Sequence, residues 1–443
     1  MNPGQTQQPP SVLGDNRLVR ILIGSILLGF GWQIRGSGTS DPSVVILLFL
    51  LYLSVLYSPR KKFNMIVFAF VIYVFGSLRT GWGTFVAQAG IPGLYPGHIP
   101  PNYGEGYDLV VQWWQGYFWL LIVGFSWAGF PSLFFGGYFF TERKYTLKDL
   151  FVCVVLFMVG KFVGQLIAEQ LIPLIAPQYY NEIYLTGLSR RNYTSMVGNM
   201  STAIGIIPVL LYIWFHNKDK GFVVRSVVVM SLFAFALSIA DIWQAIGRNN
   251  PAWELPFWSL WEYFTGFIFG GLVIWYYGRI PKEQWNASDI PTGLEPIAEM
   301  SRFDQFLIYS VALYHFLLYG LQESINGSIR VVSEQLKVES IASTHTVEAV
   351  IVVISLLLYY LYRQGTICPR LAKKSFREKS LILLIAMLPV YYLCFAMPHI
   401  VKGDLFQLSA SNSAVWLDTI SFVIVEIYGV YLYLKSRGTF ITM

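Results

Sequence analysis

The sequence has few of the residues that build disulfide frameworks or metal centres. Its 443 residues include three cysteines and five histidines. The cysteines lie in or beside apolar runs without a CxxC pair, and the histidines lack HxH or HxxxH spacing. We therefore expect no disulfide framework, no bound metal and no cofactor. The P-loop, GxSxG and HExxH motifs and the dinucleotide fingerprint are also absent.

Charge is scarce as well. Charged residues make up 13% of the chain, against about 25% in a typical soluble domain. Hydrophobic residues make up 55%, and the mean hydropathy is +0.52. This balance predicts an all-α, polytopic integral membrane protein. No loop is long enough to bury a core of its own, so we predict one transmembrane helical domain over 1–443 and no separate soluble domain.

About 12 apolar runs are long enough to cross roughly 30 Å of hydrocarbon as helices. They lie at 18–35, 43–58, 63–80, 112–137, 148–172, 198–215, 222–246, 258–277, 303–322, 346–363, 379–398 and 415–435. The second is short, and the fourth is interrupted by Pro131.

The basic residues predict the orientation of these spans. Most of the 31 Lys and Arg residues fall in alternate loops, on the side that carries both termini. Because cytoplasmic loops are enriched in Lys and Arg, we expect both termini in the cytoplasm. Residues 1–17 would then form a polar tail, 278–302 a cytoplasmic connector, and 81–111, 173–197 and 323–345 outer loops. The positive charge therefore predicts contact with membrane lipids rather than with nucleic acid.

Polar and aromatic residues gather at the opposite, outer ends of the spans. The stretch GFGWQIRGSG (29–38) is one example, since an indole, an amide and a guanidinium lie at the end of the first span. The candidate binding residues are Trp32, Gln33, Arg35, Arg79, Trp82, Trp113, Gln244, Arg248, Trp258, Trp261, Gln322, Asn326 and Arg330. We place only Trp127, Trp214, Trp275 and Trp285, of the 14 tryptophans, on or toward the inner side.

Helical spacing joins some of these residues on common faces. Asp241, Gln244 and Arg248 stand at i, i+3 and i+7 of one span, and Trp258, Trp261 and Glu262 at i, i+3 and i+4 of the next. The connection between the two spans is short, so we expect them to be neighbours. Carboxylates, amides and flat aromatic faces together suit a saccharide or glycoconjugate.

These patterns favour a membrane-embedded enzyme with a site open to the outer face. Paired carboxylates could hydrolyse a glycoside, one as acid and the other as base or nucleophile. The candidates are Asp241, Glu262 and Glu323. We expect the protein in a bacterial inner (plasma) membrane, with its site facing the periplasm.

Other interpretations remain open. The twelve-span layout is also typical of a secondary transporter for a sugar or another polar solute, with Lys161, Gln165 and Glu169 stepping along one helix face. A transferase with a lipid-linked donor is a third possibility. In a purely structural interpretation, the tryptophans anchor the interface and the carboxylates form salt bridges with nearby arginines.

Overall fold

The computed structural model describes residues 16–35, 43–57, 113–138, 147–175, 187–281 and 376–436, with isolated positions in 140–145 and 350–361. Its long helices are α1 (Arg17–Ile34), α2 (Ser43–Tyr57), α4 (Trp113–Ser132), α5 (Leu147–Ile175), α6 (Gly187–Phe215), α7 (Lys220–Ala240), α9 (Phe257–Tyr277), α16 (Phe376–Lys402) and α17 (Ser413–Ser436). The shorter ones are η2 (Leu133–Tyr138), α8 (Ile242–Asn249), η5 (Pro251–Trp253) and η7 (Ala410–Asn412). No strand occurs within these ranges, so the predicted all-α class is confirmed there.

Seven of the described helices are long and apolar enough to cross a membrane, and α2 and α4 contain shorter apolar stretches. The chain is therefore a helical membrane protein by length and composition. The predicted spans 63–80 and 303–322 lie outside the described residues, and 346–363 is described only at isolated positions. The total of about 12 spans and the membrane side of the termini stay predictions.

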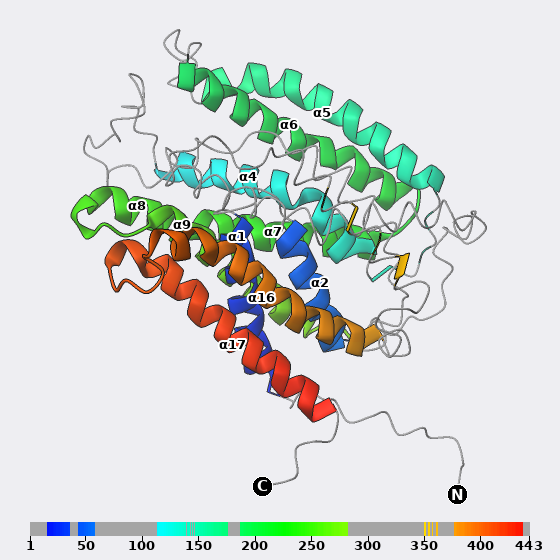
Figure 1. Cartoon of the computed structure of the whole chain (residues 1–443). Coiled ribbons are helices and arrows are strands. Elements are labelled where there is room, and N and C mark those ends of the chain that lie inside the picture. The colour runs from blue at the N-terminus through cyan, green and yellow to red at the C-terminus, as the bar shows by residue number, and fades with distance from the viewer. Residues whose placement is uncertain are drawn as a thin grey trace, which may run out of the picture.

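The helices form a layered bundle (Figure 1). The α5–α6 hairpin lies at one edge, and the α16–α17 hairpin lies at the opposite edge. Between them are α1, α4, α7 and α9, and α2 packs against both α1 and α16. The site described below is formed by residues of α1, α4, α9 and α17.

Small residues bring α1 and α9 into backbone contact. A methyl group on Gly266 would lie 2.1 Å from the Leu28 carbonyl oxygen, and one on Gly270 would lie 2.4 Å from the Gly24 carbonyl oxygen. Gly266 and Gly270 are four residues apart, which is the GxxxG spacing by which membrane helices approach closely. This contact fixes the positions of the α1 and α9 side chains that face each other further along the helices.

Two helix boundaries differ from the sequence-based prediction. α6 begins at Gly187, so the predicted 173–197 loop is much shorter, because the polar first turns of α6 continue the helix beyond its apolar part. The predicted 222–246 span is divided at Asp241 into α7 and α8. The interruption predicted at Pro131 is present, since α4 changes there into the π-helix η2.

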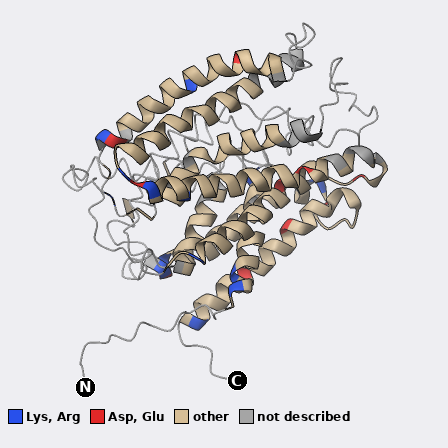
Figure 2. Cartoon of the chain, turned by 180° about the vertical axis from the view of Figure 1, so that it is seen from behind, with Lys and Arg blue, Asp and Glu red and all other residues tan. Residues whose placement is uncertain are grey.

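Lys and Arg residues gather at one end of the bundle, where α1, α7 and α16 begin and α9 and α17 end (Figure 2). We call this the basic end. Arg17 joins two helices there by donating to the Trp275 carbonyl oxygen at 3.1 Å.

Asp219 organises the start of α7 at the basic end. Its Oδ1 accepts from the Phe222 amide at 2.9 Å and so caps the helix. Its Oδ2 accepts from the hydroxyls of Thr141 and Tyr145. Burial raises the pKa of the Tyr145 phenol, and the nearby Asp219 carboxylate raises it further, so Tyr145 stays a hydrogen-bond donor.

Candidate functional site

Polar and aromatic side chains from four helices lie together at the end of the bundle opposite the basic end. We call this group the Arg35 cluster. It consists of Trp32, Gln33 and Arg35 at the end of α1, Trp127 of α4, Trp258 and Glu262 near the start of α9, and Asp418 near the start of α17.

A buried ion pair lies at the centre of the cluster. The Arg35 guanidinium lies 3.5 Å from the Glu262 carboxylate, and the two side chains are 2% and 0% exposed. The same Glu262 oxygen accepts a hydrogen bond from the Trp258 indole at 3.1 Å. The predicted shared face of Trp258 and Glu262 is therefore confirmed. With water excluded, the attraction between the two charges is far stronger than at a surface.

Two indoles cover the Arg35 guanidinium. Its central carbon lies 4.7 Å from the centre of the Trp32 ring and 5.3 Å from the centre of the Trp127 ring. The sequence-based expectation that Trp127 lies at the opposite end from Trp32 was wrong, because both rings contact the same guanidinium. The flat rings and the cation attract each other.

Asp418 lies beside Glu262. The residue after Glu262 on α9 is Tyr263, and its hydroxyl lies 2.8 Å from the Ser421 hydroxyl on α17. The side chains of the two helices are therefore in contact at this level. Asp418 is three residues before Ser421, on the same face of α17. Its charge interacts with that of Glu262, and it is 0% exposed.

The remaining described candidates lie on the α7 side of α9. The Trp261 indole donates to the Leu237 carbonyl oxygen at 3.2 Å, which confirms that α7 and α9 are neighbours. Asp241 follows Leu237 by one turn, at the junction of α7 and α8. Asp241 and Gln244 are both buried.

Several predicted site residues lie outside the part that the structure describes. These are Arg79, Trp82, Gln322, Glu323, Asn326 and Arg330, together with the side chains of Trp113 and Arg248.

Sequence reasoning missed two members of the cluster. Asp418 is a carboxylate inside the last apolar run. Asp241 was selected because it is a carboxylate inside an apolar run, so the same criterion could have identified Asp418. Trp127 gave no such signal, because a tryptophan in the middle of a 26-residue helical run resembles any core aromatic.

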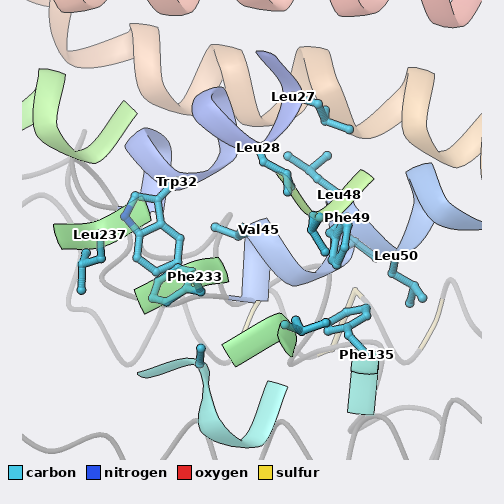
Figure 3. Packing of buried hydrophobic residues seen from close by; sticks show 14 of the residues in the cluster. Leu27, Leu28, Trp32, Val45, Leu48, Phe49, Leu50, Phe135, Phe233 and Leu237 are labelled. Carbon is cyan, nitrogen blue, oxygen red and sulfur yellow. The ribbon is translucent and has the colours of Figure 1, made fainter. Parts of the chain in front are cut away.

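Aromatic rings fill the bundle between the cluster and the basic end. The Trp32 ring lies 4.9 Å from Phe233, which lies 5.3 Å from Phe269. Phe269 lies 6.1 Å from Phe49, and Phe49 lies 4.8 Å from Phe135. Figure 3 shows Trp32, Phe233, Phe49 and Phe135 among leucines of the same core. Within the described residues, the cluster thus has an apolar layer beneath it.

No protein-family model, curated protein or solved structure matches the chain. The class of protein therefore follows from the fold and the cluster alone. It is a helical membrane protein with a buried, charged and aromatic group of residues at one end of its bundle.

Proposed function

We propose that the chain is a membrane-embedded enzyme that acts on a saccharide or glycoconjugate from one face of the membrane. The observation that carries the proposal is the position of the Arg35 cluster, at one end of the bundle and above the aromatic layer that leads from Trp32 to Phe135. An enzyme needs access from one side, whereas a carrier needs a polar path that can open to both.

The chemistry that suits these residues is glycoside hydrolysis. One carboxyl group protonates the glycosidic oxygen as the bond to the anomeric carbon breaks, and a second carboxylate takes a proton from the attacking water or attacks the carbon itself. Glu262 would be one of the pair, with Arg35 and Trp258 fixing its orientation. Asp241 and Glu323 are the partners predicted from sequence. Trp258, which is 37% exposed, offers an indole face for stacking against a sugar ring.

The orientation of the site is part of the proposal. With most Lys and Arg at the basic end (Figure 2), the positive-inside rule places that end in the cytoplasm. The Arg35 cluster would then face the periplasm or exterior of a bacterial inner membrane.

The test is turnover of 4-nitrophenyl α- and β-glycosides of common hexoses and N-acetylhexosamines by the purified protein in detergent. Glu262→Gln should lower turnover at least about 100-fold, within the range that acid–base groups contribute. Asp241→Asn and Glu323→Gln identify the partner. Asp404→Asn is the matched control, because Asp404 pairs with His399 in the α16–α17 connection. Unchanged turnover in all three site variants would refute the mechanism.

The carrier alternative has its own test. Lys161, Gln165 and Glu169 lie on α5 at the edge of the bundle, where Gln165 donates to Glu169 at 2.8 Å. Proteoliposomes that accumulate labelled sugar under a proton or sodium gradient would favour transport and contradict the one-sided enzyme.

A further inference from the structure

Asp418 is a buried carboxylate for which the described part of the chain provides no hydrogen-bond donor. Its side chain is 0% exposed, and neither carboxylate oxygen accepts a hydrogen bond there. Burying a carboxylate without donors is costly, and such groups in native proteins usually have a function. Glu262 differs, because Arg35 and Trp258 both contact one of its oxygens.

Gln33 is a second buried polar side chain of this kind. It is 1% exposed, and neither its amide nitrogen nor its amide oxygen has a partner among the described residues. A methyl group on Gly29 would lie 3.0 Å from Cζ of Tyr263, so this face of α1 meets Tyr263. Gln33 is one turn beyond Gly29 on that face, and Asp418 is one turn beyond Ser421, the partner of Tyr263. Gln33 and Asp418 are therefore at the same level, next to Glu262.

The unsatisfied atoms of the cluster specify the chemistry of a ligand. In the described part of the chain, the acceptors are both Asp418 oxygens, Oε2 of Glu262 and the Gln33 carbonyl oxygen. The donors include the Gln33 amide and the Trp32 indole. Hydroxyl groups can satisfy both sets, because each donates and accepts. An ammonium group alone has no acceptor for Gln33 and Trp32, so the ligand needs hydroxyl groups there. A phosphate would be repelled by Asp418, whose carboxylate has no hydrogen-bond donor in the described part of the chain.

We propose that Asp418 and Gln33 bind the hydroxyl groups of a saccharide and hold it beside Glu262. This inference rests on the proposed function and narrows it, since it names sugars without a phosphate group over sugar phosphates. It also adds Asp418 to Asp241 and Glu323 as a candidate for the second carboxyl group. The two carboxyl groups lie in different environments, which is how paired acids divide the roles of acid and base.

The first experiment needs no ligand. A carboxylate kept for binding is destabilising in the free protein, so Asp418→Asn should raise the melting temperature in detergent by about 2 °C or more. The paired Asp404→Asn control should leave it unchanged or lower it, since Asp404 contacts His399 at 3.0 Å. A lower melting temperature for Asp418→Asn would show that Asp418 is structural and would overturn the proposal.

The second experiment measures binding. The melting temperature of the purified protein is measured with and without added sugar. The sugars are D-glucose, D-galactose and D-mannose, together with the 2-amino-2-deoxy derivative and the 6-phosphate of each. At least one sugar without a phosphate group should stabilise the wild-type chain, with a tenfold or greater loss of affinity in Asp418→Ala and Gln33→Ala. A preference for a phosphate, or no response to any sugar, would overturn the assignment.

The two proposals can fail separately. Binding that depends on Asp418, without turnover of any glycoside, would keep the binding site and refute hydrolysis. Turnover that Asp418→Ala leaves unchanged would refute the role of Asp418 and keep the enzyme.

Discussion

Arg35 and Glu262 form a buried ion pair at 3.5 Å between the end of α1 and the start of α9. Their meeting depends on the close approach of the two helices at Gly266, which sets the distance between the facing side chains. Three further features surround the pair: two indoles over the cation, one indole on the anion, and Asp418 beside it. The geometry of the site therefore depends on how closely α1 and α9 pack.

The first prediction concerns the stability that depends on this pair. Glu262→Met leaves the Arg35 guanidinium buried without its anion, so the free energy of unfolding should fall by about 3–5 kcal/mol. The double variant Arg35→Met/Glu262→Met removes both charges and should recover much of this loss. Denaturant unfolding in micelles of the wild type, each single variant and the double variant gives the coupling energy.

The half-exposed pair of His399 and Asp404 is the control for this cycle. Its partners are 26% and 28% exposed, so Asp404→Asn should cost no more than about 1 kcal/mol. Additive losses in the Arg35–Glu262 cycle would show that the two charges do not stabilise each other.

The second prediction compares two tryptophans that each lie under a cation. Trp127 lies under the buried Arg35, and Trp214 lies under the exposed Lys220 at 5.6 Å. A desolvated cation–π contact contributes about 2 kcal/mol or more, and an exposed one about 0.5–1 kcal/mol. Trp127→Leu should therefore lower the free energy of unfolding clearly more than Trp214→Leu. Equal losses would mean that Arg35 gains nothing from Trp127.

Sequence reasoning predicted the helices better than it predicted the site. Apolar runs are a direct consequence of the bilayer, so nine of the predicted spans coincide with described helices to within a few residues at most ends. The start of α6 was missed because polar turns that extend past the apolar part carry no hydrophobic signal. The break at Asp241 was missed because the run around it stays apolar.

Within the site, only neighbours on one helix could be predicted with their geometry. The i, i+4 spacing of Trp258 and Glu262 gave their shared face, and a hydrogen bond joins them. The pairing of Arg35 with Glu262 depends on the packing of α1 against α9. The proximity of Asp418 to Glu262 depends on the position of α17 beside α9. Neither can be derived from spacing along the chain.

The third prediction concerns the contact that places α1 against α9. In Gly266→Ala the added methyl group would lie 2.1 Å from the Leu28 carbonyl oxygen, so the helices must move apart. We expect a loss of about 1–3 kcal/mol in the free energy of unfolding. Gly278→Ala is the control, because its methyl group would lie 3.4 Å from the Ile274 carbonyl oxygen, an ordinary contact. A Gly266→Ala protein as stable as the control would contradict this packing.

The fourth prediction concerns which face of the membrane the Arg35 cluster faces. Gln407, in the exposed connection between α16 and α17, marks the end that carries the cluster, and the exposed Lys220 marks the basic end. Cys153, Cys368 and Cys394 are first replaced by alanine, and then Gln407→Cys or Lys220→Cys is introduced. In intact bacterial cells with a permeabilised outer membrane, a membrane-impermeant maleimide should label the cysteine at 407 and not the one at 220.

Disruption of the inner membrane should expose the cysteine at 220 to the same reagent, which shows that its thiol is reactive. The physical reason is the positive-inside rule, because Lys and Arg on the short connections of the basic end oppose their translocation. The reverse labelling pattern would place the Arg35 cluster toward the cytoplasm. An enzyme with these residues would then take its saccharide from inside the cell, and the proposed periplasmic location of the site would be refuted. The proposed binding of a saccharide by Asp418 and Gln33 would not be affected.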